Sequence, residues 1–536
     1  MSVQRRMLVH QPFFATARRL PGKVALICDG RRHTYAQMAA GIERLAALLT
    51  ARGVKRGDRV ALFLDNSAEL VTGMLAASMI GAVFMPIGSL TRQEKLAYLL
   101  NDSRASVLIS HAALRHIWET AISANGSVHL CLIVEAGDDA SPWGPRCLSY
   151  PSEPPVHLLA DSPSVAQSSV ASVESVENND LSESDLASII YTSGSTGEPK
   201  GVMLTHLNMR SALRSVSGYL PVRESEIIMC VLPLAFSYGL YHWLLVAEAG
   251  ATLILESSFA FPLKIARQMA AERVTFFPGV PTVFTQLLNI KGLDEIDLAS
   301  LRTITNAAAP LSREHIRRLR QAFPQAALYS MYGLTECKRV TFLPPDQLDI
   351  RPDSVGRGMP CQDHWLADET GTPLPNGGVG ELVVRGPHVM RGYWEKPAET
   401  AARLRPAPAS SPFHGELVLY TGDLFRTDEA GWLYFVARQD DIVKTRGEKV
   451  SPREVEDAIY ALDGVLEVAV IGIPDELLGA AIKAFVITRP GAVLTAREVI
   501  RHCLAHIESY MAPKYVEFVA ELPKTESGKI KKTQLR

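Results

Sequence analysis

Residues 191–201 read YTSGSTGEPKG and follow an apolar run at residues 186–190. A strand that gives way to alternating glycines and hydroxyl residues exposes several backbone N–H groups, which together form an anion-binding concavity. The glycines allow positive φ and a close approach of the backbone to a ligand, while the lysine adds a positive charge. The stretch therefore predicts a phosphate-binding loop, whose members are Thr192, Ser193, Gly194, Ser195, Thr196, Gly197 and Lys200.

Two common nucleotide-binding motifs do not describe this loop. A Walker loop needs Ser or Thr directly after the lysine, where this chain has Gly201, and the dinucleotide pattern G-x-G-x-x-G does not fit either. A plain Ser/Gly surface turn is the alternative, although a turn does not require a lysine between Pro199 and Gly201. The run TSGSTGEPKG resembles the signature loop of the adenylate-forming (AMP-binding) enzymes, which include acyl- and aryl-CoA synthetases, stand-alone adenylation enzymes of natural-product pathways, and luciferases.

This resemblance implies an α/β fold in two parts: a large N-terminal domain of layered sheets and helices, and a small, mobile α+β C-terminal domain. The residue pattern agrees. A chain of 536 residues is too long for one hydrophobic core, and β-like runs alternate with amphipathic helical patterns between residues 23 and 110, which predicts a largely parallel sheet. We place the boundary in the polar segment 437–450, so that residues 1–439 form the first domain and residues 440–536 the second.

Smaller features complete this expected organisation. Ser and acidic residues dominate about 161–186, which predicts a flexible surface insertion; a passive linker is favoured over a cover for the loop. In the C-terminal part, capping boxes are expected to begin two helices, one formed by Ser451 with Glu454 and one by Thr495 with Glu498.

Composition limits the partners and the compartment. A net charge of -2 and a pI near 6.7 give no bulk attraction to nucleic acid. The seven cysteines are scattered and contain no C-x-x-C pair, so we expect a reducing cytoplasm. Residues 70–91 and 227–246 lack charges but contain Gly and Pro, so we expect no stable membrane insertion. The N-terminus lacks the apolar core of a signal peptide, and no export is expected.

The resemblance extends to segments that would bind the nucleotide and Mg²⁺. The small residues after the strand at 303–305 match the family's adenine-contacting segment, YGLTE at 332–336 matches its nucleotide motif, and LYTGDL at 419–424 matches its ribose motif. It implies that Thr335 meets the α-phosphate, that Glu336 ligates Mg²⁺, and that Asp423 and Arg438 hold the ribose. The adenine side would be formed by Asn306, Ala307, Ala308, Tyr332 and Gly333.

The segment 232–240, LPLAFSYGL, matches the family's acid pocket but departs from its usual LPLFHxxG. Amino-acid-activating relatives carry an Asp near Ser237, whose hydroxyl cannot pair with an ammonium; an unpaired buried ammonium is costly, so an α-amino acid is disfavoured. A similar C-K-R follows YGxTE in some relatives that activate β-amino acids, where the cations meet a second polar group. The alternative is that both cations are solvated or paired with a structural carboxylate. The expected pocket residues are Phe236, Ser237, Gly239, Lys338 and Arg339.

The C-terminal segment 523–530, PKTESGKI, resembles the family's catalytic lysine segment. The resemblance implies that Lys529 bridges the substrate carboxylate and the α-phosphate, that Asp440 is the hinge, and that Lys444 and Gly447 face the site during thioester formation. In-line attack of a carboxylate on a phosphate brings two anions together, so charge neutralisation and positioning are what the chemistry demands.

The predicted activity is ATP-dependent conversion of a carboxylic acid to an acyl-AMP with release of pyrophosphate, followed by transfer to a thiol. ATP and Mg²⁺ are the expected cofactors, with CoA or a carrier-protein phosphopantetheine as acceptor. Three alternatives remain: delivery to a carrier protein or an amine, a luciferase-like oxygenase, and a non-enzymatic binding protein. The acid, the acceptor and the oligomeric state stay open.

Overall fold

The computed structural model describes residues 8–123, 125–135, 146–150, 181–193, 198–445, 448–475, 478–525 and 530–535. Several residues singled out from the sequence lie outside this part of the chain: residues 161–180 of the Ser-rich insertion, Gly194, Ser195, Thr196, Gly197, Gly447 and Lys529. For Ser193, Asp440 and Lys444 the backbone is described.

The first sheet has eight strands in the order β19-β9-β8-β4-β3-β5-β6-β7. Its strands from β8 to β7 are parallel neighbours, whereas β9 is antiparallel to β8 and β19 is antiparallel to β9. The predicted, largely parallel sheet is thus confirmed. Its strands are β3 (Arg59–Leu64), β4 (Val83–Gly88), β5 (Val107–His111), β6 (Leu130–Val134), β7 (Cys147–Ser149), β8 (Leu186–Ser193), β9 (Pro199–Thr205) and β19 (Gly392–Tyr393). The helices in this part of the chain are α2 (Tyr35–Ala51), α3 (Ala68–Met79), α4 (Gln93–Ser103) and α5 (Arg115–Ser123).

The second sheet has nine strands in the order β16-β15-β14-β13-β12-β10-β11-β1-β2, and one continuous hydrophobic cluster joins it to the first sheet. Its strands are β1 (Val24–Cys28), β2 (Arg31–Thr34), β10 (Ile227–Cys230), β11 (Thr252–Leu255), β12 (Phe276–Gly279), β13 (Thr303–Asn306), β14 (Ala327–Tyr332), β15 (Thr341–Leu343) and β16 (Arg357–Gly358). The neighbouring helices are α1 (Gln11–Arg19), α7 (His206–Ser217), α8 (Ser237–Ala249), α9 (Pro262–Ala271), α10 (Pro281–Leu288) and α11 (Arg313–Ala322).

Strand β10 ends before the apolar run 227–234 does. It ends at Cys230, because the chain then leaves the sheet: the backbone N–H of Leu234 donates to Oδ1 of Asn66 at 2.8 Å instead of to a neighbouring strand. The irregular turn that results, residues 231–236, leads directly into α8.

A third sheet is built from β17, β18, β20, β21 and β22, and a separate small sheet and hairpin follow it. Asp423 lies within β21, and the strand accommodates Gly422 at φ 73°. The elements are β17 (Asp363–Ala367), β18 (Val379–Arg385), α12 (Pro397–Arg403), β20 (Leu404–Pro406), β21 (Leu417–Thr427) and β22 (Leu433–Arg438). The last part of the chain contains β23 (Val443–Thr445), β24 (Glu448–Val450), α13 (Pro452–Tyr460), β25 (Val465–Asp475), β26 (Gly479–Thr488), α14 (Ala496–His506) and β27 (Tyr515–Phe518).

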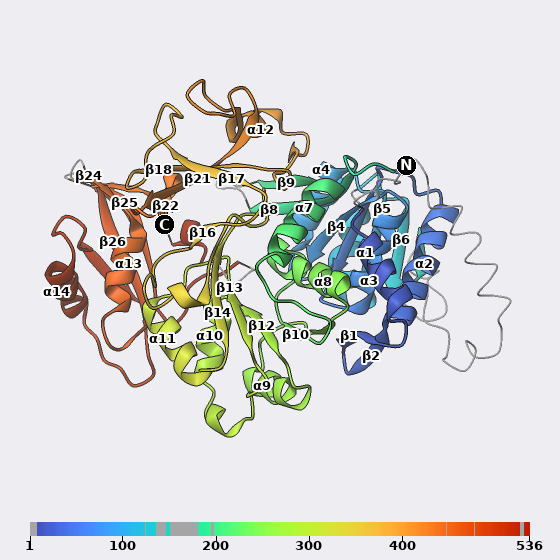
Figure 1. The fold of residues 1–536 in the computed structure, drawn as a ribbon, viewed down its shortest axis with the longest axis horizontal. Helices are drawn as coiled ribbons and strands as arrows, with labels where there is room; N and C mark the ends of the chain where they lie inside the picture. Colours follow the sequence, from blue (N-terminus) through green and yellow to red (C-terminus); the bar gives the residue numbers. More distant parts are fainter. Residues whose placement is uncertain are drawn as a thin grey trace.

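This last part has a hydrophobic core of its own, drawn from β23, β24, α13, β25, β26 and α14. Figure 1 shows it at one end of the molecule, with β3 to β6 at the other end. The capping box at Thr495 is confirmed, and a second capping box, at Thr34, begins α2. The box at Ser451 is wrong, because its hydroxyl instead donates to the carbonyl of Val436 at 2.6 Å and so ties β22 to the start of α13.

None of the described helices combines the length and the apolar composition that crossing a bilayer takes.

Candidate active site

The candidate site lies where four parallel strands of the second sheet end. Strands β10, β12, β13 and β14 run in the same direction, so their carboxyl ends meet at one edge of the sheet, where ligands of open α/β sheets bind. Asn306 ends β13 and Tyr332 ends β14. The predicted nucleotide residues are therefore brought together by strand pairing, although the two segments are separated in sequence.

The residues predicted to bind the ribose contact one another across two sheets. The phenol of Tyr332 in β14 donates to Oδ2 of Asp423 in β21 at 2.6 Å, and Nε of Arg438 lies 3.4 Å from Oδ1 of the same carboxylate. Asp423 and Arg438 are direct partners in the β21–β22 ladder. Burial, followed by the negative charge of Asp423, raises the pKa of Tyr332 well above its usual range, so its hydroxyl remains a donor. Asp423 is buried, while 58% of the Arg438 side chain is exposed, which leaves a guanidinium open to a ligand.

The adenine segment contributes a buried polar atom without a partner. The amide nitrogen of Asn306 donates to the carbonyl of Ala309 at 2.9 Å, but its Oδ1 is buried and accepts no hydrogen bond from the described residues. Ala308 has a positive φ of 72°, a strained conformation for a residue with a side chain. A free acceptor beside small residues fits a flat base that carries an amino group.

The predicted phosphate loop joins β8 to β9. These strands form an antiparallel hairpin in which Thr192 pairs with Lys200 and Ser193 with Pro199. The ammonium of Lys200 lies 5.7 Å from the centre of the Tyr393 ring, and the Tyr393 hydroxyl donates to Oε1 of Glu336 at 2.7 Å. The loop and the predicted metal ligand are thus linked through one aromatic side chain.

The Glu336 carboxylate suits the metal that the sequence predicts. It is half-buried, and its position is fixed by the Tyr393 bond and by a backbone hydrogen bond from Met390 N–H to the Glu336 carbonyl at 2.7 Å. A carboxylate oxygen completed by phosphate oxygens and water is the usual environment of Mg²⁺. Burial and the adjacent carboxylate raise the pKa of Tyr393, so the phenol stays protonated beside Glu336.

The five residues proposed for the acid pocket line one cavity of about 90 Å³, together with Ala307, Ala308, Gly333 and Thr335. Phe236, Ser237 and Gly239 come from the start of α8, and Lys338 and Arg339 from the segment after β14. The prediction that these segments share a pocket is therefore supported by the geometry. The interpretation of Lys338 and Arg339 as solvated is wrong, because they are only 5% and 3% exposed.

Aromatic rings and a carbonyl surround the two cations. Nζ of Lys338 donates to the Ser237 carbonyl at 2.7 Å and lies 4.3 Å from the centre of the Tyr241 ring. The guanidinium carbon of Arg339 lies 5.0 Å from the centre of the Tyr238 ring. Burial, reinforced by the charge of Arg339, lowers the pKa of Lys338 well below its usual range.

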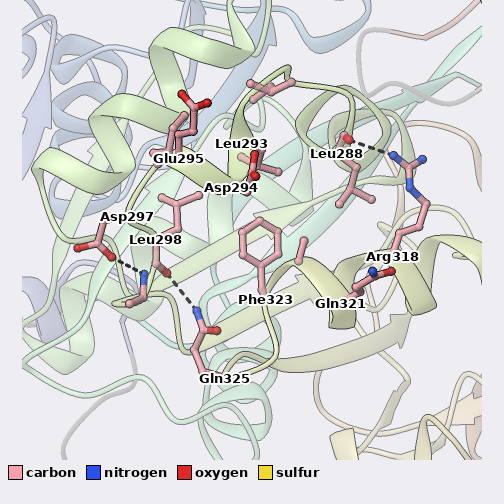
Figure 2. Close-up of a pocket in the computed structure, with 14 residues that line it drawn as sticks. Leu288, Leu293, Asp294, Glu295, Asp297, Leu298, Arg318, Gln321, Phe323 and Gln325 are labelled. Carbon is pink, nitrogen blue, oxygen red and sulfur yellow. Dashed lines mark hydrogen bonds between the residues drawn. The ribbon is translucent and has the colours of Figure 1, made fainter.

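A larger hollow of about 800 Å³ lies elsewhere, lined mainly by the segment 290–299 and the end of α11 (Figure 2). Two of its polar side chains bind backbone groups: Arg318 donates to the Leu288 carbonyl at 2.9 Å and Gln325 to the Leu298 carbonyl at 3.1 Å. No residue predicted from the sequence for the site lines it. We therefore assign the candidate site to the smaller cavity.

Comparison with known proteins agrees with this assignment. Residues 13–394 match the family model of the AMP-binding enzymes, and residues 454–529 match the model of the AMP-binding enzyme C-terminal domain. The chain belongs to the AMP-binding enzyme family. It has the adenylate-forming fold, with a large N-terminal and a small C-terminal domain, and is an AMP-forming acid–thiol ligase of the acyl-CoA ligase type.

Three similar proteins illustrate the likeness. A long-chain-fatty-acid–CoA ligase of Bacillus subtilis (strain 168) is 31% identical over 533 residues, covering 97% of this chain and 92% of the relative. A feruloyl-CoA synthase of an Amycolatopsis species is 34% identical over 527 residues, covering 97% and 96%. The structure of ATP-bound MatB from Rhodopseudomonas palustris superposes with a TM-score of 0.84 at 29% identity, covering 99% and 98%.

Two residues of this AMP-binding enzyme were missed by the sequence prediction. Tyr393 carries the contact between the phosphate-loop hairpin and Glu336, and Tyr238 lies under both cations, with its hydroxyl 2.9 Å from the Thr305 carbonyl. Neither is marked by a local pattern, since each acts on residues far away in the sequence. ATP and CoA are the co-substrates that the family implies.

Proposed function

We propose that the chain activates a carboxylic acid at the cavity beside Thr335, forms an acyl-AMP with release of pyrophosphate, and transfers the acyl group to CoA. One observation carries the proposal: the acid cavity and the Tyr332–Asp423–Arg438 set both border the YGLTE segment. Both reactants would therefore meet at residues 332–336. Positioning of this kind converts a bimolecular step into an effectively unimolecular one.

In this proposal the nucleotide is held from three sides. Asp423 and Arg438 would bind the ribose, and Asn306, Ala307, Ala308, Tyr332 and Gly333 would border the adenine, with the free Oδ1 of Asn306 available to its amino group. The phosphate-binding loop, residues 192–200, would bind the pyrophosphate as it leaves. Glu336, oriented by Tyr393, would hold Mg²⁺, which neutralises phosphate charge when bound.

The acid would lie in the cavity with its reacting carboxylate toward Thr335, where the α-phosphate is expected. Lys529 would bring a positive charge to the developing anion, the kind of stabilisation that contributes most to such reactions. Asp440 would serve as the hinge that carries the C-terminal domain, residues 440–536, between the two half-reactions. Lys444 and Gly447 would then border the thiol.

CoA is the acceptor we favour over a carrier protein or an amine, because the relatives that match along nearly the whole chain carry the names of CoA ligases. A reducing cytoplasm is the compartment we propose, supported by the free state of all seven cysteines. Membership of a natural-product pathway remains a hypothesis from sequence.

Pyrophosphate release from ATP across a panel of carboxylic acids, with and without CoA, tests the proposal. We expect acid-dependent release, and acyl-CoA only when CoA is present. Asp423→Ala should raise KM for ATP, because the ribose loses its carboxylate acceptor. An acid panel that supports no pyrophosphate release, or release that is independent of the acid, would contradict the proposed function.

A further inference from the structure

Helix α4 contacts both strands of the phosphate-loop hairpin, β8 and β9. Tyr98 and Asp102 lie four positions apart and therefore share one face of this helix. The hydroxyl of Tyr191 in β8 donates to Oδ2 of Asp102 at 2.6 Å. The hydroxyl of Tyr98 lies 3.2 Å from the carbonyl of Pro199 in β9 and 3.5 Å from Oδ1 of Asp102. One helix face thus holds one residue of each strand.

The two residues held by α4 directly precede two residues predicted to bind phosphate. Tyr191 precedes Thr192, and Pro199 precedes Lys200. Thr192 and Lys200 are partners in the β8–β9 ladder, and the Thr192 hydroxyl lies 3.5 Å from the Lys200 carbonyl. A shift of the backbone at either held residue would therefore displace the neighbouring hydroxyl or ammonium. The contacts with α4 fix these two groups relative to each other.

The path of the Tyr191 ring toward α4 depends on a glycine in the other strand. Tyr191 and Gly201 are direct partners in the ladder. A Cβ at position 201 would lie 3.1 Å from Cζ of Tyr191 and 2.7 Å from Cγ2 of Ile189, so even one methyl group would crowd the ring. The ring packs on the same hydrophobic cluster as Tyr98. The missing side chain at Gly201 thus allows the Tyr191 hydroxyl to reach Asp102.

The position of Asp102 is unfavourable for its own helix. Asp102 lies in the last turn of α4, which ends at Ser103. The partial negative charge at the carboxyl end of a helix favours cations there and disfavours a carboxylate. The helix gains nothing from this charge, and the contacts with the two tyrosines stabilise it instead. Burial, together with the bond to Asp102 and its negative charge, raises the pKa of Tyr191 above its usual range, so the Tyr191 hydroxyl remains a donor.

We propose that Asp102, acting through Tyr191 and Tyr98, is a positioning residue for the phosphate-loop hairpin. This inference rests on the proposed function, in which Thr192 and Lys200 bind the terminal phosphates of ATP and then the pyrophosphate. Asp102 is not itself a ligand of the nucleotide, because a carboxylate repels phosphate. Its role is to hold the hydroxyl and the ammonium in place before ATP arrives, which reduces the ordering that binding would otherwise require.

Nucleotides with and without the terminal phosphates test this role. Isothermal titration calorimetry on the full-length protein, with Mg²⁺, measures Kd for α,β-methylene-ATP and for AMP. The first keeps three phosphates but cannot release pyrophosphate, because a methylene group joins its α- and β-phosphorus atoms. Tyr191→Phe and Asp102→Ala should each raise Kd of α,β-methylene-ATP by about tenfold, the low end for loss of a hydrogen bond to a charged group. Kd of AMP should not change, because its proposed contacts lie on the other two sheets.

Kinetics and a conservative variant separate positioning from a general loss of structure. In both variants KM for ATP should rise by about tenfold while KM for the acid stays at the wild-type value. Asp102→Asn keeps an oxygen that can accept the Tyr191 bond, so it should restore most of the affinity for α,β-methylene-ATP. The double variant Asp102→Ala/Tyr191→Phe should show less than the product of the two single effects, because both changes remove the same bond.

Tyr35→Phe is the matched control. The Tyr35 hydroxyl is also buried, and it donates to the carbonyls of Ala251 at 2.8 Å and Val246 at 3.0 Å. These partners lie in α8 and directly after it, and not in the hairpin. The variant should lower Tm, because a buried carbonyl loses its donor, and should leave Kd of both nucleotides unchanged.

The outcomes separate this inference from the proposed function. If both variants weaken α,β-methylene-ATP and AMP equally, or weaken neither, Asp102 does not position the hairpin and the inference is overturned. Equal weakening in Asp102→Asn and Asp102→Ala would overturn the role of the hydrogen bond. If the wild-type protein binds neither nucleotide, the proposed function itself fails. Asp102→Ala decides the question if Tyr191→Phe does not fold, and Tyr191→Phe decides it in the opposite case.

Discussion

The hydroxyl of Tyr393 donates a 2.7 Å hydrogen bond to the carboxylate of Glu336, 57 residues earlier in the chain. Tyr393 belongs to β19, which pairs with β9 of the phosphate-loop hairpin, whereas Glu336 follows β14 of the other sheet. The bond therefore fixes the predicted metal ligand relative to the predicted phosphate loop. A shift of the phosphate loop would therefore also move Glu336.

Tyr393→Phe should weaken the use of Mg²⁺, because Glu336 loses the donor that orients it. Loss of an outer partner of a metal ligand typically costs about 10- to 100-fold in metal affinity. The concentration of Mg²⁺ that gives half-maximal pyrophosphate release should rise by about that factor, with the rate largely restored at high Mg²⁺. Trp394→Phe is the control, since its indole N–H donates to the Asp102 carbonyl and not to Glu336. An unchanged Mg²⁺ dependence in Tyr393→Phe would show that Glu336 needs no such support.

Lys529→Ala should slow acyl-AMP formation by about 10²–10³, by analogy with the loss of one donor to a developing oxyanion. Pyrophosphate release in a single turnover measures this step, and thermal unfolding checks the fold. Lys524→Ala, in the same terminal segment but paired with Glu467 at 2.8 Å, should form the adenylate normally. Adenylate formation at the wild-type rate in Lys529→Ala would remove this residue from the mechanism.

Asp440→Pro should separate the two half-reactions. Proline fixes φ, and the residue lies in the short helical turn Gln439–Asp441 between β22 and β23. Acyl-AMP formation should stay near the wild-type rate. Acyl-CoA formation from it should slow by about tenfold or more, because the C-terminal domain can no longer close for this step. Asp440→Ala keeps φ free and should retain both steps. If the proline variant loses both half-reactions equally while its thermal unfolding matches the wild type, the hinge lies elsewhere.

Gly239→Ala should deform the acid cavity. A Cβ at this position would lie 2.4 Å from the Pro233 carbonyl oxygen and 2.9 Å from that of Leu232, so the start of α8 has to shift. Overpacking of this kind typically costs about 1–3 kcal/mol of stability, and KM for the acid should rise. Urea unfolding and acid-dependent pyrophosphate release measure the two effects. Gly22→Ala is the control, because a Cβ there meets nothing within 4 Å, and it should change neither stability nor KM. If Gly239→Ala keeps the wild-type stability and KM, α8 tolerates the extra atom.

The sequence by itself determined the strands and helices whose signals lie within short segments. Alternating apolar runs and helical patterns predicted the parallel strands of the first sheet, and Thr495 with Glu498 predicted the capping box of α14, because capping and periodicity depend on residues within one turn of each other. Prediction from the sequence failed where a contact with a residue farther along the chain replaced a local one. Ser451 donates to the Val436 carbonyl instead of capping its own helix.

Only the tertiary structure decided what the candidate site contains. A charged pair such as Lys338 and Arg339 is most often exposed, and no local pattern shows that α8 and its tyrosines cover both residues. In the same way, Tyr393 reaches Glu336 only because β19 adds to the edge of the hairpin. Burial and long-range pairing depend on how distant elements pack, and packing therefore decides whether a cation is solvated or buried.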